Sequence, residues 1–397
     1  MIDFSLTEEQ LSIQRTARDF AQEKMKPVGV EADRIPDPRE VWPKVAEVVK
    51  MGIDLGFHTM VIPTEYGGGG VDHRTIGIVW EELGAGDVGI GGNIGISNIA
   101  WLPLLIAGTE EQKRKWLTEV CSDTAGMSVG CWGATEPSGL AFSVDAFLEG
   151  GAAVTVQTAA KPEGNSYVIN GQKSFITGGG IAKVCTLLAN TPEGPTHFFV
   201  PTDTRGLTVG KQEDMMGFRC LNDVGLFFDD MRIPKENLVG EQGGNGVMEL
   251  LGTLGYSDPW VAALSNGITR AAYEAAFEYS KIRVLTGKPI IRFQTVSMML
   301  ADMFLELEAS RDLTWKSLWY NDTHPTPDHK LAMAAKIFAT DTAMKVTTDA
   351  IQVYGGAGYM KENPVEKYMR DAKIMQIFEG TNQLLRIFMG AFLYLGM

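Results

Sequence analysis

Hydrophobic and polar positions divide the chain into three regions. From residue 6 to about residue 106 the apolar positions recur at helical spacing, and Thr7-Glu-Glu-Gln10 has the residue types of a capping box. This pattern predicts an N-terminal α-helical domain over residues 1–125. The helices expected within it cover residues 40–51, 73–84, 92–107 and 109–120.

The pattern changes near residue 126, where short apolar runs alternate with turn residues up to about residue 238. Strands are predicted over residues 153–159, 166–169, 184–189, 198–200, 207–210 and 224–228. Asn170-Gly171 has the composition of a hairpin turn. Because no helical segment separates these runs, they favour a barrel or sandwich over βαβ units.

Residues 239–397 return to helical periodicity. Long helices are predicted over residues 246–283, 291–322 and 327–354, with shorter ones over 363–370 and 381–395. Long helices joined by short connections favour an antiparallel bundle. The expected fold class is therefore α+β and multidomain: an N-terminal helical domain (1–125), a middle β-barrel (126–238) and a C-terminal four-helix bundle (239–397).

Composition narrows the classes of partner. The net charge of −14 and the pI near 4.9 argue against nucleic acid or an anionic membrane as the main partner. The longest strongly apolar run, residues 96–107, is too short to span a bilayer, so no membrane insertion is expected. The four cysteines form no CxxC pair and the N-terminus has no targeting character. We therefore expect a cytoplasmic protein with reduced thiols.

The sequence supports neither a dinucleotide-binding Rossmann motif nor a common hydrolase or phosphate-binding motif. Gly84-Ala-Gly-Asp-Val-Gly89 matches GxGxxG, but a helical stretch precedes it where a dinucleotide fold requires a strand. It is interpreted as a glycine-rich break between helices. No HExxH, GxSxG or P-loop occurs, and the five histidines are scattered, so no metal site is expected.

One carboxylate has the surroundings of a catalytic group. Glu379 lies between the apolar pair Ile377-Phe378 and a glycine, with Thr381 or Asn382 as the N-cap of a following helix. Apolar neighbours raise the pKa of a carboxyl group, which suits a general base. By itself, however, a glutamate beside a helix N-terminus is more often a solvated partner of the helix dipole than a catalytic group.

Four further stretches are unusual in combination, although each alone also fits a strand residue, a surface charge or a helix end. They are Trp132-Gly-Ala-Thr-Glu-Pro137, Gly171-Gln-Lys-Ser-Phe-Ile-Thr177, Arg283-Val-Leu-Thr-Gly287 with Phe293-Gln294, and Gln352-Val-Tyr-Gly-Gly-Ala-Gly-Tyr359. Their order, ending in the Glu379 stretch, resembles the acyl-CoA dehydrogenase family over essentially the whole chain.

The resemblance implies a helical domain, a β-barrel and a four-helix bundle, with FAD as the cofactor and a homotetramer as the assembly. Trp132, Ala134 and Thr135 would lie along the flavin ring, with Phe175 and Thr177 on its other side. The residues that would reach the remaining parts of FAD, in part the FAD of a neighbouring subunit, are Arg283, Gln294, Gln352, Gly356, Thr381 and Gln383.

The same resemblance implies the chemistry. Glu379 would remove the α-proton of an acyl-CoA thioester while the β-hydrogen passes as hydride to the flavin, giving the 2-enoyl-CoA. Its backbone N–H would bond the thioester oxygen where negative charge develops. The electrons would then pass to an electron-transferring flavoprotein.

The chain departs from the family pattern at residues that are expected to lie near the acyl-CoA substrate. Asp258 stands near the place of a usual arginine, and three interpretations remain open: a second acid or base, a polar substrate contact, or an N-cap before Pro259. The loop after Pro137 is longer than usual, so Ser138 and Ser143 are both candidates for the CoA-contacting serine.

The expected acyl pocket contains Gly91, Gly92 and Gly95. Small residues there would leave space, which predicts a bulky, branched or cyclic acyl group. Two other functions remain as alternatives: a family relative that runs as an enoyl-CoA reductase, an oxidase or a non-redox lyase, and a flavin-binding interaction protein without turnover.

Overall fold

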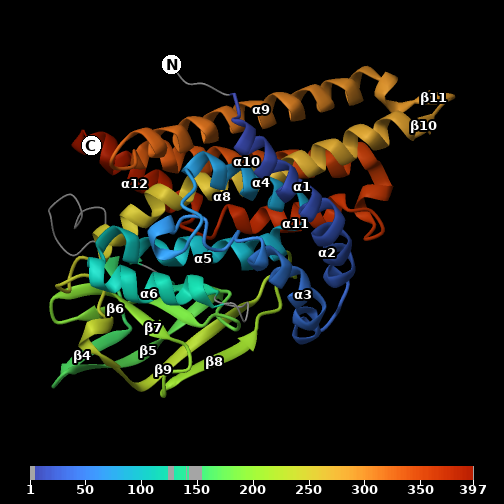
Figure 1. Cartoon of the computed structure of the whole chain (residues 1–397). Coiled ribbons are helices and arrows are strands. Elements are labelled where there is room, and N and C mark those ends of the chain that lie inside the picture. Colours follow the sequence, from blue (N-terminus) through green and yellow to red (C-terminus); the bar gives the residue numbers. More distant parts are fainter. Residues whose placement is uncertain (1–4, 124–128, 140, 143–153, 397) are drawn as a thin grey trace.

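The computed structural model describes residues 5–123, 129–139, 141–142 and 154–396. Helices from both ends of the chain pack together, and a curled sheet formed by the middle of the chain lies at one side of them (Figure 1). The α+β fold class predicted from the sequence is confirmed.

The N-terminal helices start as their capping residues predict. Thr7 and Gln10 form a reciprocal capping box, in which each side chain accepts a hydrogen bond from the other residue's backbone N–H at 3.1 Å. The α-helices of this region are α1 (Glu8–Phe20), α2 (Lys26–Asp33), α3 (Val41–Asp54), α4 (His73–Gly86), α5 (Val88–Ala107) and α6 (Glu110–Ser122), with a π-helical turn Ala21–Met25 between α1 and α2.

The literal GxGxxG is a helix break, as interpreted. Helix α4 ends at Gly86 and α5 begins at Val88, with the Asp87 side chain accepting a hydrogen bond from the Ile90 N–H at 2.9 Å. A Cβ on Gly84 would lie 2.2 Å from the Leu264 carbonyl oxygen. The glycine is therefore needed for a close helix crossing, not for a phosphate.

Helix α5 is longer than the apolar run from which it was predicted. It covers 20 residues and is apolar enough, by length and composition, to cross a membrane. However, 72% of its most apolar window is buried inside the protein, where it packs against α3, α4, α8 and strand β1. This burial is typical of a core helix.

The middle region forms a seven-stranded sheet with the order β1-β6-β4-β5-β9-β8, and β7 pairs with β6. The strands are β1 (Gly130–Gly133), β4 (Ala159–Glu163), β5 (Ser166–Thr177), β6 (Val184–Thr191), β7 (Gly194–Pro201), β8 (Leu207–Gln212) and β9 (Asp223–Pro234), and a separate pair joins β2 (Ala141–Phe142) to β3 (Val154–Thr155). Most pairs are antiparallel, but β1 pairs β6 in parallel.

The hairpin predicted at Asn170-Gly171 is wrong. These residues lie inside β5 at a register shift opposite β9, and the chain turns earlier, at Gly164-Asn165 between β4 and β5. The Asn170 amide donates to the Asp230 carboxylate at 3.0 Å and accepts from the Asp230 N–H at 2.9 Å. Tertiary pairing therefore uses the Asn-Gly composition for a bulge.

The C-terminal region contains α8 (Gly246–Ile282), α9 (Gln294–Thr323), α10 (His329–Tyr354), α11 (Val365–Met375) and α12 (Asn382–Leu395). Helix α8 packs against α4, α9 and α10, and it is buried over most of its first 27 residues. A small hairpin, β10 (Val284–Leu285) with β11 (Lys288–Pro289), joins α8 to α9 and projects from the end of the bundle (Figure 1).

Candidate active site

The Glu379 stretch forms a tight loop between α11 and α12. Glu379 has φ of 54° and Gly380 has φ of 89°, so two successive residues adopt the left-handed conformation. A glutamate in that conformation is uncommon and requires support from its surroundings. Thr381 is the N-cap of α12, since its Oγ1 accepts a hydrogen bond from the Leu384 N–H at 3.1 Å.

The Glu379 carboxylate accepts a hydrogen bond from the Ser257 hydroxyl of α8 at 2.6 Å. Burial of the carboxyl group raises its pKa from 4.5 to about 7, while the Ser257 hydrogen bond and the positive charge of Lys336 act in the opposite direction. The residue as a whole remains partly exposed. A carboxyl group with this pKa can both accept and release a proton near neutral pH.

Lys336 holds the loop from α10. Its ammonium group donates to the Gly380 carbonyl oxygen at 2.7 Å and to the Asn382 Oδ1 at 3.1 Å, and its side chain is completely buried. Burial lowers the pKa of Lys336 to about 8, opposed by the charges of Asp258 and Glu379. Sequence reasoning missed this residue, because a lysine inside an otherwise ordinary helical pattern gives no local signal.

Asp258 is not an N-cap, because α8 begins at Gly246, twelve positions earlier in the chain, and continues through Pro259. Its side chain is completely buried, and neither carboxylate oxygen has a hydrogen-bond partner among the described residues. Burial raises its pKa well above the ordinary value, and the charge of Glu379 raises it further. The structure therefore leaves the other two interpretations of Asp258 open.

Helix α11 and the start of the loop also contact Phe218, in the connection between β8 and β9. The Asp371 carboxylate of α11 accepts a hydrogen bond from the Phe218 N–H at 2.7 Å and forms an ion pair with Lys367 at 2.6 Å. The Phe218 ring packs against Phe378, the residue before Glu379, with ring centroids 6.2 Å apart. These contacts place the carboxylate of Glu379 where the helical bundle meets the middle domain.

The predicted residues on β1 lie over a buried polar network. The Trp132 indole N–H donates to His197 Nε2 at 3.3 Å, and His197 Nδ1 lies 2.7 Å from the Glu249 carboxylate. Since the indole can only donate, His197 Nε2 accepts, and Nδ1 carries the proton toward Glu249. The hydrogen bond to His197 therefore fixes the orientation of the Trp132 indole.

The next residues of the same stretch are held by an ion pair that sequence reasoning missed. Lys173 and Glu136 are completely or almost completely buried and approach to 2.9 Å, and Lys173 also donates to the Ala134 carbonyl oxygen at 3.1 Å. The Thr135 carbonyl oxygen accepts from the Ser174 N–H at 3.0 Å. The ion pair and these hydrogen bonds therefore join the stretch 132–137 to the stretch 171–177 of β5.

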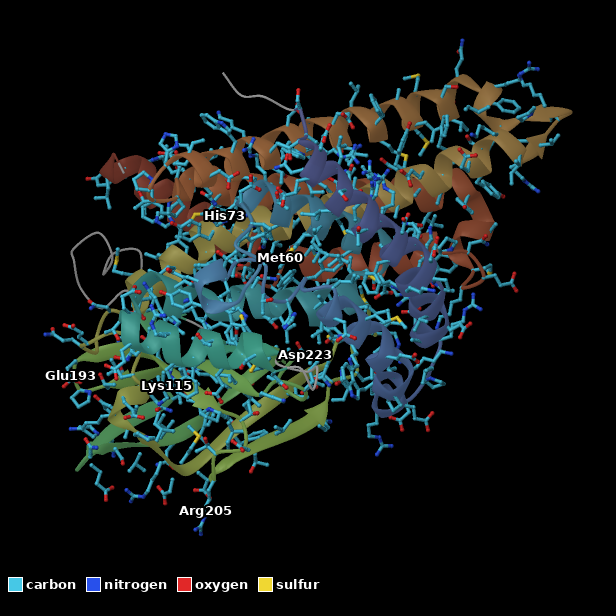
Figure 2. The ribbon with its side chains drawn as sticks, viewed as in Figure 1. Met60, His73, Lys115, Glu193, Arg205 and Asp223 are labelled. Atoms are coloured by element: carbon cyan, nitrogen blue, oxygen red, sulfur yellow. The ribbon has the colours of Figure 1, made fainter. Side chains whose placement is uncertain are left out.

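Phe175 and Thr177 lie on the second of these motifs. Phe175 has φ of 58° at a register shift of β5, and its ring is 68% exposed, which is unusual for a large aromatic side chain. Thr177 contacts the Asp223 carboxylate at 3.5 Å, where the sheet meets the helices (Figure 2). Burial raises the pKa of Asp223 to about 7, and its Oδ1 has no partner among the described residues.

Of the two serines predicted as candidates for contacting CoA, the structure describes only one. Ser138 is exposed, and its hydroxyl contacts only the adjacent Gly139 carbonyl oxygen, at 3.4 Å, among the described residues. Ser143 lies outside the described residues. The role of each in contacting CoA remains a prediction.

The residues predicted to reach the far part of FAD are exposed. Arg283 caps α8 at the base of the projecting hairpin, and its side chain has no ion pair within the described chain. Thr286 and Gly287, with φ of 46° and 82°, form the turn of that hairpin. The other exposed members of this set are Gln294, Gln352, Gly356 and Gln383.

The three glycines of the expected acyl pocket leave no open space along their Cβ directions, and their place in that pocket remains a prediction. A Cβ on Gly95 would lie 2.8 Å from the Trp80 ring, one on Gly92 would lie 2.7 Å from Leu221, and one on Gly91 would lie 3.1 Å from Leu83. These glycines allow neighbouring side chains to approach α5 closely. A glycine in the sequence does not by itself predict open space, because a larger side chain from elsewhere in the chain can pack against it.

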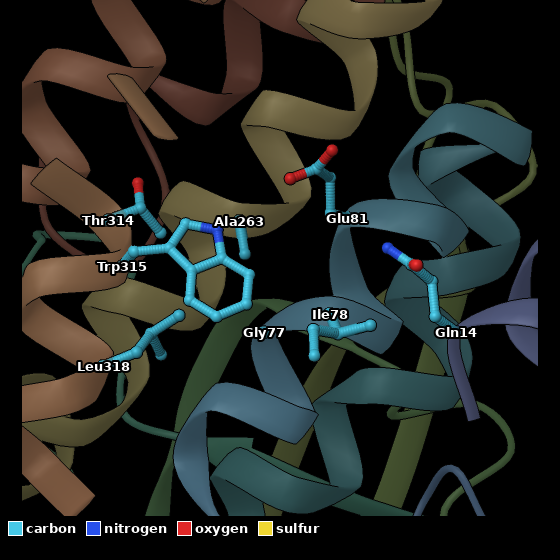
Figure 3. A pocket seen from close by; sticks show the side chains of 8 residues that line it. All are labelled: Gln14, Gly77, Ile78, Glu81, Ala263, Thr314, Trp315 and Leu318. Carbon is cyan, nitrogen blue, oxygen red and sulfur yellow. The ribbon is translucent and has the colours of Figure 1, made fainter. Parts of the chain in front are cut away.

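A small pocket lies between α1, α4, α8 and α9, and none of the predicted site residues lines it (Figure 3). It measures about 20 Å³ and is lined by Glu81, Thr314 and Trp315 among others. That volume holds about one water molecule. Among the described residues no group of three or more His, Cys, Asp or Glu side chains could hold a metal ion.

The residues present fit a flavin dinucleotide. Phe175 offers an exposed aromatic face beside Thr177, and the orphaned Asp223 Oδ1 provides a polar partner at the same edge of the sheet. Arg283 offers a planar donor fork of the kind that binds phosphate, although it lies on a separate face of the chain.

Family models for three acyl-CoA dehydrogenase domains match this chain in order. The N-terminal domain matches residues 7–124, the middle domain residues 131–231 and the C-terminal domain residues 244–394.

Relatives cover almost the whole chain. The short-chain specific acyl-CoA dehydrogenase of Sus scrofa mitochondria is 35% identical over 94% of this chain and 87% of its own length. The cyclohex-1-ene-1-carbonyl-CoA dehydrogenase of Syntrophus aciditrophicus is 36% identical over 97% of this chain and 90% of its own length.

Solved structures agree with the fold. The butyryl-CoA dehydrogenase of Megasphaera elsdenii has a TM-score of 0.88 and 36% identity, covering 99% of this chain and 100% of that one. A chain from work on the electron transferring flavoprotein of Acidaminococcus fermentans and flavin-based electron bifurcation has a TM-score of 0.88 and 37% identity, covering 99% of each.

Proposed function

Because this chain belongs to the acyl-CoA dehydrogenase family and is an oxidoreductase with FAD as its cofactor, we propose that it dehydrogenates a short-chain acyl-CoA thioester between the α and β carbons. The product would be the 2-enoyl-CoA. FAD, when bound, supplies the acceptor for the hydride. The protein must therefore remove one proton, orient the thioester and keep water away from the reacting carbons.

Glu379 carries the proposal as the general base. Its carboxyl group lies in a loop with left-handed backbone, accepts one hydrogen bond from Ser257 and has its pKa raised to about 7. Such a carboxylate is ionised often enough at neutral pH to accept a proton, and it is more basic than a solvated glutamate. No other described carboxylate combines these three features.

The backbone beside Glu379 supports stabilisation of the thioester oxygen. Within the described residues the N–H of Glu379 makes no hydrogen bond, while the adjacent loop is fixed through Gly380 and Thr381. A fixed, unused N–H next to the base can donate to an oxygen on which negative charge develops as the α-proton leaves. The carbonyl would thus be polarised by the residue that removes the proton.

We propose a short, unbranched acyl group because neighbouring side chains pack closely against Gly91, Gly92 and Gly95 of α5. Trp80, Leu83 and Leu221 fill the space directly beside the three glycines, where extra room for a bulky or cyclic group was expected. The relatives named for short-chain and butyryl substrates are as similar to this chain as the relative named for a cyclic substrate. The close packing of α5 is the observation that supports our choice of the short chain.

An exposed apolar surface supports a proposed assembly, and a structural similarity supports a proposed electron acceptor. Ile282, Val284 and Leu285 surround Arg283 at the projecting hairpin and are 53–76% exposed. A second subunit would cover this apolar surface and allow Arg283 to reach its FAD, which supports a homo-oligomer such as a tetramer. An electron-transferring flavoprotein is the proposed acceptor, in line with the similarity to the chain from the Acidaminococcus work.

The proposal is tested with the purified flavoprotein. A panel of acyl-CoA thioesters is added anaerobically, and loss of the oxidised flavin absorbance is recorded. Butyryl-CoA should bleach the flavin faster than a cyclic or long-chain thioester. Absence of bleaching by every member, with FAD bound, would contradict the proposal; product analysis and oxygen reactivity separate a dehydrogenase from a reductase, oxidase or lyase.

A further inference from the structure

Two buried ionisable groups lie beside Glu379 and have no part in the proposed chemistry. Asp258 on α8 and Lys336 on α10 are both completely buried, and each interacts electrostatically with the other and with Glu379. Three ionisable side chains from three separate elements thus share one low-dielectric region. Their charges cannot be assigned independently.

The hydrogen bonds of Lys336 are directed to the loop and not to Asp258. Its ammonium group donates to the Gly380 carbonyl oxygen and to Asn382 Oδ1, at 2.7 and 3.1 Å. Among the described residues it has no carboxylate within the 4.0 Å of an ion pair. Two other charges act on it, Asp341 and Arg386, and these pair with each other at 2.7 Å.

Asp258 has no donor to stabilise a negative charge. Both of its oxygens are buried without a hydrogen bond among the described residues, and the charged groups that act on it are Lys336 and Glu379. An ionised carboxylate without donors has a large desolvation cost, so a buried group of this kind retains its proton. A second negative charge would also make Glu379 harder to ionise.

We infer that Asp258 remains protonated while Lys336 remains charged and bound to the catalytic loop, so that the single negative charge of this cluster resides on Glu379. Asp258 and Lys336 are then positioning residues: Lys336 fixes the loop and favours the ionised base, and Asp258 adds no competing charge. The inference rests on the proposed role of Glu379 as the base.

The charge of Asp258 is measured without any substrate. Infrared spectra are compared at pH 7 for the wild-type protein and for Asp258→Asn, so that the difference spectrum reports the Asp258 carboxyl group while Glu379 keeps its charge. The difference spectrum should contain one carbonyl band of a protonated carboxylic acid, present in the wild type and lost in Asp258→Asn. Loss of a carboxylate band instead would overturn the assignment.

The effect on the base is measured from the pH dependence of flavin bleaching by the best acyl-CoA. Asp258→Asn should leave the acid midpoint in place, because an uncharged amide replaces an uncharged acid. Lys336→Met should raise the midpoint by about one unit or more, since a neighbouring positive charge is lost. Lys336→Arg, which keeps the charge, should restore most of that shift.

Two outcomes of this second experiment contradict the inference. A midpoint that falls by a unit or more in Asp258→Asn would show that Asp258 is normally ionised. An unchanged midpoint in Lys336→Met would remove Lys336 from the tuning of the base. If no thioester bleaches the wild-type flavin, the proposed function fails, while the infrared comparison still decides the charge of Asp258.

Discussion

The Glu379 loop and the projecting hairpin at Arg283 are both assigned to the same reaction, yet they differ in how they are supported. The Glu379 loop is held within its own chain: Ser257 donates to Glu379, Lys336 donates to Gly380, and Thr381 is the N-cap of α12. Arg283 is exposed, and its side chain has no ion pair within the described chain.

The difference shows which part of the site one chain completes. A base needs a fixed geometry and a controlled pKa, and both come from packing inside the bundle. Arg283, the proposed phosphate-binding residue at the base of the hairpin, would gain its partners only when a cofactor or a second subunit arrives. We therefore expect substitutions at Glu379 to affect chemistry, and substitutions at Arg283 to affect cofactor binding.

The largest effect is expected from Glu379→Gln. Removal of the base should slow flavin bleaching by about a thousandfold or more, because a positioned general base contributes about 10²–10⁴ and no second ionised carboxylate lies in place. FAD should remain bound at wild-type stoichiometry, measured from its absorbance. Bleaching at a rate close to that of the wild type would remove Glu379 from the mechanism.

Next in size is the effect of Arg283→Ala on FAD retention. Hydrogen bonds to charged groups contribute about 1.5–3 kcal/mol, so FAD affinity should fall by about 10- to 100-fold, measured by titration of the apoprotein. The rate of bleaching by the FAD-saturated variant should change little. Arg283→Lys is the matched control, and unchanged affinity in Arg283→Ala would show that the hairpin does not reach the cofactor.

The packing of α5 is tested by a pair of glycine variants. In Gly95→Ala the new Cβ would lie 2.8 Å from the Trp80 ring, so we expect a loss of about 1–3 kcal/mol in the free energy of unfolding. In Gly356→Ala nothing lies within 4 Å, and the change should stay within about 0.5 kcal/mol. Denaturant unfolding measures both, and equal losses would contradict the close approach of Trp80.

The smallest effect concerns the pH dependence of the base. With a pKa of about 7, Glu379 loses its negative charge as the pH falls, so the bleaching rate should decrease below neutrality. The Ser257 hydrogen bond favours the ionised form, so Ser257→Ala should move the midpoint upward, by about one unit. Ser257→Thr keeps a hydroxyl and is the control, and a downward shift in Ser257→Ala would contradict the assigned hydrogen bond.

The order of the three regions could be predicted because periodicity is a local property of the sequence. The observed limits of helices α4, α5 and α8 lie within four residues of the predicted ones. Thr381, one of the two predicted N-caps, is the N-cap of α12. Asn170-Gly171 was predicted incorrectly for a physical reason. The same two residues suit a turn or a bulge, and only pairing with β9 selects the bulge.

The sequence by itself determined the succession of helical and strand regions, the motifs of a flavin enzyme and the identity of the candidate base. These depend on spacing along the chain and on residue chemistry. Tertiary structure decided the features that depend on distant neighbours: the position of Lys336 under the Glu379 loop, the unpartnered burial of Asp258 and the filling of the glycine face by Trp80. A pKa or a free volume is set by the groups that surround a site in space, and those groups come from α4, α8 and α10, far apart in the sequence.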